Sequence, residues 1–115
     1  MRTQEQERNY NLAKIIQQQL FLGGKMIVFS WGSCNYKAIK NGLQFNVNGF
    51  RLKNGIVQII LDEGKDLYII NFIKRNLIIK TITDVFFEDL TSFIDKEVEL
   101  TENYNKDVEN AVYQF

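Results

Sequence analysis

The chain has 115 residues, of which 45% are hydrophobic and 24% are charged, and its formal net charge is zero. This balance is typical of a single globular domain, and the length suffices to bury an ordinary core. No apolar run approaches the roughly 20 residues that span a bilayer. The only cysteine, Cys34, cannot form an intrachain disulfide, so nothing points to an oxidising compartment. We therefore expect a cytoplasmic protein without a membrane segment.

The chain is expected to begin with a helix that ends near Leu22. The apolar residues that share one face of this helix are Leu12, Ile15, Ile16 and Leu20. The pair Gly23-Gly24 follows, and glycine adopts the left-handed conformation that closes many helices. The sequence therefore predicts an N-terminal helix with a sharp end.

Residues 26–31, Met-Ile-Val-Phe-Ser-Trp, are expected to form the first strand. A hairpin is predicted next, because residues 36–40 and 43–47 flank Asn41-Gly42, a dipeptide that favours tight turns. Within residues 43–47, apolar and polar side chains alternate, which predicts one buried and one wet face.

The centre of the chain consists of three apolar runs, at residues 56–61, 67–73 and 77–82. They are rich in β-branched and aromatic residues and are separated by short polar segments, which predicts strands joined by hairpins. We therefore expect an antiparallel meander at the centre of the sheet.

A second helix is expected from residue 85 to about residue 97, with Asp84 as its N-cap. Its predicted core face consists of Phe86, Leu90, Phe93 and Ile94. Residues 99–115 are acidic and weakly patterned, so they form either a short final helix or a flexible tail. The expected division is one domain at residues 1–98, followed by an acidic C-terminal segment at residues 99–115.

Together these elements predict an α+β fold. We expect a single, mostly antiparallel sheet of about five strands, a meander with hairpins, flanked by an N-terminal and a C-terminal helix on one face. The central strands are apolar on both sides, whereas two helices cover only one side. The other side could be covered by the C-terminal segment, by a second copy face to face, or through pairing of an edge strand. We predict a homodimer or a protein partner.

Charge is distributed unevenly along the chain. Residues 8–61 contain seven basic residues and no acidic residue, whereas residues 82–115 have an excess of seven acidic residues. Basic and aromatic side chains occur together in the first half, as in single-strand nucleic-acid binders. The candidate contact residues for a partner or a nucleic acid are Lys25, Trp31, Tyr36, Lys37, Lys40, Arg51 and Lys53. The simpler interpretation is that Phe29 is a core residue, that Trp31 is half-buried, and that the lysines are merely solvated.

The sequence contains little that could support catalysis. It lacks histidine, so the commonest acid–base group and metal ligand is missing. Asp62, Glu63 and Asp66 cluster around a glycine, but their spacing does not match a calcium-binding EF-hand loop. No glycine-rich phosphate loop is present. We predict no catalytic, metal or cofactor residues, hence a non-enzymatic binding protein that acts through protein–protein contacts; the alternative is a single-stranded nucleic-acid-binding protein.

A diffuse pattern of residues extends from Leu12 to about Glu97. The segments that carry it are residues 13–20, Gly23-Gly24, Ser30-Trp31-Gly32, residues 41–45, residues 66–68 and residues 85–90. This layout resembles small uncharacterised proteins encoded by bacteriophages and other mobile elements of gut bacteria. The chain departs from the pattern by an extra Phe21-Leu22 before the glycine pair and by the absence of a threonine-glycine after the last helix. The resemblance implies a phage or mobile-element setting, and no activity of the family can be transferred to a residue.

Overall fold

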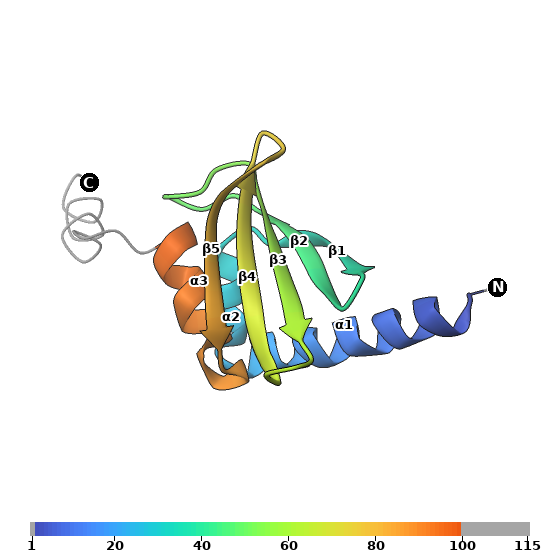
Figure 1. Ribbon diagram of the computed structural model, residues 1–115. Helices are drawn as coiled ribbons and strands as arrows, with labels where there is room; N and C mark the ends of the chain where they lie inside the picture. The colour runs from blue at the N-terminus through green and yellow to red at the C-terminus, as the bar shows by residue number, and fades with distance from the viewer. Residues whose placement is uncertain (1, 100–115) are drawn as a thin grey trace, which may run out of the picture.

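The computed structural model describes residues 2–99, which form an open five-stranded antiparallel sheet with three helices on one face (Figure 1). The helices are α1 (Gln4–Leu22), α2 (Lys25–Ser30) and α3 (Leu90–Val98), and a 3₁₀ turn, η1 (Phe87–Asp89), precedes the last of them. The strands are β1 (Cys34–Ile39), β2 (Gly42–Val47), β3 (Gly55–Asp62), β4 (Leu67–Lys74) and β5 (Leu77–Val85). Their order in the sheet is their order in the chain, a simple meander. The predicted α+β class is confirmed.

Helix α1 ends at Leu22, as the sequence predicts, although the C-cap Gly23 has a right-handed conformation, at φ −73°, and it is Gly24 that has positive φ. Thr3 is its N-cap, with a capping box in which Thr3 and Gln6 exchange side-chain to backbone hydrogen bonds of 2.9 and 3.1 Å. Gly23 closes the helix, and a side chain there would collide with Thr91, since a Cβ would lie 2.2 Å from its hydroxyl oxygen. The N-terminal half of α1 extends past the sheet in Figure 1.

Residues 26–31 are not a strand, and this prediction is wrong. They belong to α2 and its C-cap, Trp31, and only Val28 and Trp31 of this stretch are buried. A spacing of three places both side chains on the inner face of a single helical turn. The short apolar run favours a strand by composition, but packing against α1 and α3 selects the helix.

The two hairpins at the ends of the meander have the turn chemistry expected of them. Lys40 and Asn41 connect β1 to β2, with Asn41 at φ 57°. The expected hairpin is confirmed, one residue earlier than the Asn-Gly pair suggests, because Gly42 already belongs to β2. Arg75 and Asn76 connect β4 to β5, both with positive φ, as a type I′ turn requires.

The C-terminal helix begins later than predicted. Strand β5 continues to Val85, and Asp84 lies within it at φ 58° rather than capping a helix. Because α3 begins only at Leu90, its buried face consists of Leu90, Thr91, Ile94 and Val98. Phe86 and Phe93 are therefore not core residues, with 58% and 38% of their surface exposed. The prediction for the C-terminal segment lies, apart from Glu99, outside the described residues.

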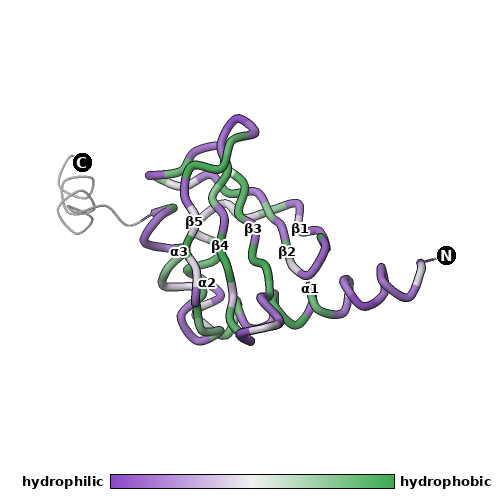
Figure 2. The backbone as a smooth tube through the Cα atoms, in the orientation of Figure 1, coloured by the Kyte–Doolittle hydropathy of each residue, from purple (hydrophilic) through white to green (hydrophobic). Residues whose placement is uncertain are grey.

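The hydrophobic core lies between the sheet and the helix layer. The fully buried residues that build it from the two sides are Ile16, Leu20, Val28, Trp31, Phe45, Val57, Ile59, Ile70, Phe72, Leu90 and Ile94. Figure 2 shows the corresponding apolar run along β3 and β4, and polar turns at both ends of the sheet. No helix of residues 2–99 lies on the face of the sheet that points away from this core.

Candidate interaction surface

The open face of the sheet is partly apolar. In the β3–β4 ladder, the pairs Val57 with Phe72 and Ile59 with Ile70 point into the core. Side chains alternate along a strand, so the intervening pairs lie on the open face. Those pairs are Ile56 with Ile73, Gln58 with Asn71, and Ile60 with Ile69. All six side chains are half-buried, because neighbours on the same face shield their flanks.

A ladder of polar side chains crosses this face perpendicular to the strands. Gln58 Nε2 donates to Gln44 Oε1 at 2.9 Å, Asn71 Nδ2 to Gln58 Oε1 at 3.5 Å, and Thr81 Oγ1 to Asn71 Oδ1 at 2.8 Å. The ladder therefore joins β2, β3, β4 and β5. We call this ladder, with the isoleucine pairs on either side of it, the open face.

Strand β5 forms the edge of the sheet beside the open face and is exposed over most of its length. Its first three residues, Leu77, Ile78 and Ile79, are 70%, 60% and 57% exposed. Edge strands ordinarily avoid three consecutive exposed aliphatic side chains, because such a run favours pairing with another chain. This edge and the open face form one continuous surface.

The predicted contact residues do not gather at one place. Lys37 pairs with Gln44 and so lies on the open face, whereas Lys40 lies in the β1–β2 turn. Arg51 and Lys53 lie in the loop of residues 48–54 at the opposite end of the sheet, and Lys25 begins α2 in the helix layer. Arg51 Nη1 donates to the Lys96 carbonyl oxygen at 2.9 Å, so this loop is bound to α3.

The two aromatic residues of that set are packed inside. Trp31 is fully buried, lies nearly parallel to Phe45 with ring centroids 6.4 Å apart, and donates from Nε1 to Asp95 Oδ1 at 2.9 Å. Tyr36 is half-buried against Phe45, and its hydroxyl donates to Ser33 Oγ at 2.6 Å. Burial raises the pKa of Tyr36. Neither ring is free to stack on a base.

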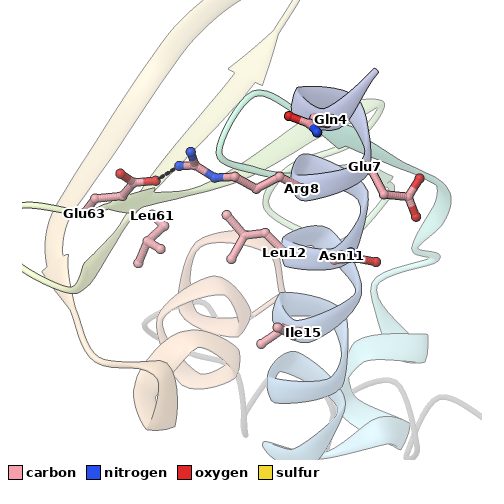
Figure 3. Close-up of a pocket in the computed structure, with 8 residues that line it drawn as sticks. All are labelled: Gln4, Glu7, Arg8, Asn11, Leu12, Ile15, Leu61 and Glu63. Carbon is pink, nitrogen blue, oxygen red and sulfur yellow. Dashed lines mark hydrogen bonds and ion pairs between the residues drawn. The ribbon is translucent and has the colours of Figure 1, made fainter. Parts of the chain in front are cut away.

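A groove of about 550 Å³ separates the N-terminal half of α1 from the end of β3 (Figure 3). Leu12, Ile15 and Leu61 supply its apolar wall, and Arg8 reaches across it to ion-pair with Glu63. Both partners of this ion pair are about half exposed, so its contribution to stability is small, on the order of 0–1 kcal/mol. The lining lacks a nucleophile paired with a base, so nothing in it points to catalysis.

Among residues 2–99, Glu99 carries the one buried carboxyl group, and the sequence does not single it out. It is 6% exposed and lines a groove of about 390 Å³ with Phe50 and Lys53. Burial raises the pKa of Glu99, the charge of Asp95 raises it further, and a hydrogen bond from the Phe50 backbone N–H lowers it. No sequence signal distinguishes Glu99 from its acidic neighbours, because its burial depends on how the 48–54 loop packs on α3.

Two further findings concern the kind of site that residues 2–99 can offer. No group of three or more cysteine, aspartate or glutamate side chains among these residues is placed to hold a metal ion. Within the same residues, no helix is long and apolar enough to cross a membrane.

Comparison of the chain with protein-family models, with curated proteins and with solved structures finds no match in any of the three. The phage or mobile-element setting that the sequence pattern implies therefore stays a prediction. The surface formed by the open face and the β5 edge is the feature from which a function can be argued.

Proposed function

We propose that this protein is a non-enzymatic binding protein that acts in the cytoplasm through protein–protein contacts, made by the open face of its sheet. Its partners include a second copy of the chain.

One observation carries the proposal: the three helices lie on one face of the sheet, while the other face presents isoleucine pairs and a polar ladder without cover from residues 2–99. Large contiguous apolar surface on soluble proteins generally marks an interaction site. The ladder holds its amide groups in fixed positions, so little side-chain entropy is lost when a partner binds. An apolar centre with a few oriented polar groups is the usual composition of a protein interface.

The nucleic-acid alternative has less support. It needs aromatic stacking platforms beside basic residues. Trp31 is fully buried and Tyr36 is half-buried, and the lysines and arginines of the set lie at four separate places on the fold. Phe29 and Phe50 are exposed beside Lys25 and Arg51, but the two pairs lie on different elements and do not form one continuous platform.

The proposal is tested by comparing two double variants that add the same charge to different faces. Ile60→Lys with Ile69→Lys places two lysines on the open face. Leu22→Lys with Met26→Lys places two lysines on the helix side, where the wild-type side chains are 83% and 79% exposed. Affinity capture from the host cell with wild-type and variant proteins, followed by quantitative mass spectrometry, measures which partners each retains.

We expect partners of the wild-type protein to be retained by the helix-side variant and reduced at least about tenfold for the open-face variant. Burying two unpaired lysines at the centre of an interface costs more than the roughly 1.4 kcal/mol that corresponds to a tenfold loss. Thermal melting establishes that both variants fold. Should the lysines unfold the sheet, Ile60→Thr with Ile69→Thr keeps the β-branched shape and removes the apolar surface. The proposal would be overturned if the open-face variant retained the wild-type partners and the helix-side variant lost them.

A further inference from the structure

The two edge strands of the sheet differ in how they are covered. Register irregularities occur at both edges, between Cys34 and Lys37 in β1 and at two places in the β4–β5 ladder, so bulges do not distinguish them. Helix α1 packs against β1. Strand β5 begins instead with the exposed run Leu77, Ile78 and Ile79, and the chain contains no proline. Of the two edges, β5 is therefore the one more open to pairing with a further strand.

Charge at the two ends of β5 is of opposite sign. At the start of β5 lie Lys74, the last residue of β4, and Arg75 of the turn, and at its other end lie Asp84, Glu88 and Asp89. Lys65 forms an ion pair with Asp84 at 3.1 Å. Neither Arg75 nor Glu88 forms an ion pair with another residue of the described part of the chain, so both charges are available to a partner.

We propose that β5 pairs with β5 of a second copy, antiparallel, so that two sheets join into one across a two-fold axis. An antiparallel arrangement places the basic end of each β5 beside the acidic end of its partner, whereas a parallel arrangement would place like charges together. The same pairing covers Leu77, Ile78 and Ile79 and satisfies the unpaired backbone groups of the edge.

The axis lies at Thr81. This residue is the midpoint of Leu77–Val85, and it lies between the two register irregularities of the β4–β5 ladder, where Lys80, Thr81 and Ile82 pair regularly with β4. Moving the two-fold axis from residue 81 to residue 80 would place the two copies of Lys80 opposite each other. Like charges directly opposite are destabilising. Lys80 is also bound to Glu97 of α3, at 2.6 Å, and points toward the helix layer. Two threonines at the axis form a favourable cross-strand pair.

This inference names one partner and the mode of binding for the proposed function, but it uses the edge rather than the isoleucine pairs of the open face. The proposed function and the proposed β5 pairing can therefore be contradicted independently of each other. Substitutions at Ile60 and Ile69 test the face, and substitutions on or beside β5 test the edge.

The first experiment measures the dimer dissociation constant of the full-length chain by sedimentation equilibrium. We expect wild-type protein and Leu22→Lys to form a dimer and Ile79→Lys to be monomeric. Arg75→Glu and Glu88→Arg should each weaken the dimer by roughly tenfold, because each reversal acts twice in a two-fold dimer. The double variant Arg75→Glu with Glu88→Arg should restore it, which a contact with an unrelated protein would not do.

A second experiment locates the axis. In a Cys34→Ser background, Thr81→Cys should yield a disulfide-linked dimer under mild oxidation, because opposed Cα atoms in antiparallel strands are about 4.5–5.5 Å apart, within disulfide reach. Thr83→Cys is the matched control, since its copies would be four residues out of register, and it should remain reduced.

Three results would overturn the inference. A wild-type chain that stays monomeric at high micromolar concentration excludes the dimer; protection of the amides of residues 77–79 in that monomer would assign the edge to residues 100–115 instead. A dimer that is indifferent to Ile79→Lys and to the charge reversals uses another surface. Cross-linking through Thr83→Cys but not through Thr81→Cys excludes the assigned axis.

Discussion

Trp31 and Glu99 show how single side chains connect α3 to the rest of the fold. The indole of Trp31 binds the Asp95 carboxylate from the core side, and Glu99 accepts a hydrogen bond from the Phe50 backbone N–H at the end of the helix. Backbone hydrogen bonds from Arg51 and Leu52 to the Val98 carbonyl oxygen, at 2.8 and 3.3 Å, complete the attachment. The loop of residues 48–54 is thus held against the C-terminal end of α3 by the backbone N–H groups of Phe50, Arg51 and Leu52.

The burial of Glu99 predicts how stability changes with pH. Its pKa is raised in the folded protein, so the protonated form is favoured by folding. The corresponding stabilisation is fully present below the pKa of the unfolded chain and is lost as pH rises through the higher folded pKa. At neutral pH the ionised Glu99 therefore lowers stability relative to a neutral side chain.

We expect Glu99→Gln to raise the melting temperature at neutral pH, since glutamine keeps an acceptor for the Phe50 N–H and removes the repulsion from Asp95. The difference from wild type should vanish at acidic pH, where Glu99 is protonated. Thermal melting across this range measures it, with the exposed Glu5→Gln as the control. A Glu99→Gln protein that is less stable than wild type at neutral pH would contradict this account.

At the scale of single residues, the sequence predicts the chemical character of a side chain better than whether that side chain is buried. Lys37 and Lys40 are exposed, as their type suggests, but Trp31 is a core residue because α2 is a helix. An aromatic side chain with a polar atom suits a binding surface and a core alike. Only the tertiary packing decides between them.

At the scale of elements, the apolar period determines which residues of α3 face the core. The actual start at Leu90 leaves Phe86 outside the helix. The buried face of Leu90, Ile94 and Val98 follows a spacing of four, and Phe93 lies at its margin, 38% exposed. A shift of the helix start is difficult to read from the sequence, since Asp84 has the chemistry of an N-cap yet lies in β5 at positive φ.

The different burial of Leu90 and Phe86 predicts a contrast between two truncations. Leu90→Ala should lower the free energy of unfolding by about 2–5 kcal/mol, the usual range for a buried leucine. Phe86→Ala should lower it by less than about 1 kcal/mol, because more than half of that side chain is already exposed. Urea unfolding of both variants measures the contrast, and equal losses would mean that both side chains belong to the core.

The strands were easier to predict than the helices. Three of the five were predicted from β-branched runs separated by short polar turns, and their pairing follows from turns too short for any connection but a hairpin. Residues 26–31 have a similar composition, which favours a strand, but they form α2 and its C-cap. The packing of α2 against α1 and α3 selects the helix, and this packing cannot be read from the composition.

At the scale of the whole fold, residues 2–99 cover one face of the sheet with helices and leave the other face without one. The sequence predicts this imbalance, because the central strands are apolar on both sides and the amphipathic helices are few. It does not predict the polar ladder, since the alignment of Gln44, Gln58, Asn71 and Thr81 across four strands depends on the register of three hairpins. The asymmetry of charge along β5 likewise emerges only once the ends of the sheet are known.

The most direct test of the central claim, that this protein makes its contacts through the sheet and not through the helix layer, is methyl NMR of the isoleucine side chains over a dilution series. Isoleucines lie on both sides of the fold: Ile78 and Ile79 on the β5 edge, and Ile15 and Ile27 on the helix layer, where they are 49% and 42% exposed. We expect concentration-dependent shifts at Ile78 and Ile79 and none at Ile15 and Ile27. Shifts confined to Ile15 and Ile27 would contradict the claim, because they would place the contact surface on the opposite side of the molecule.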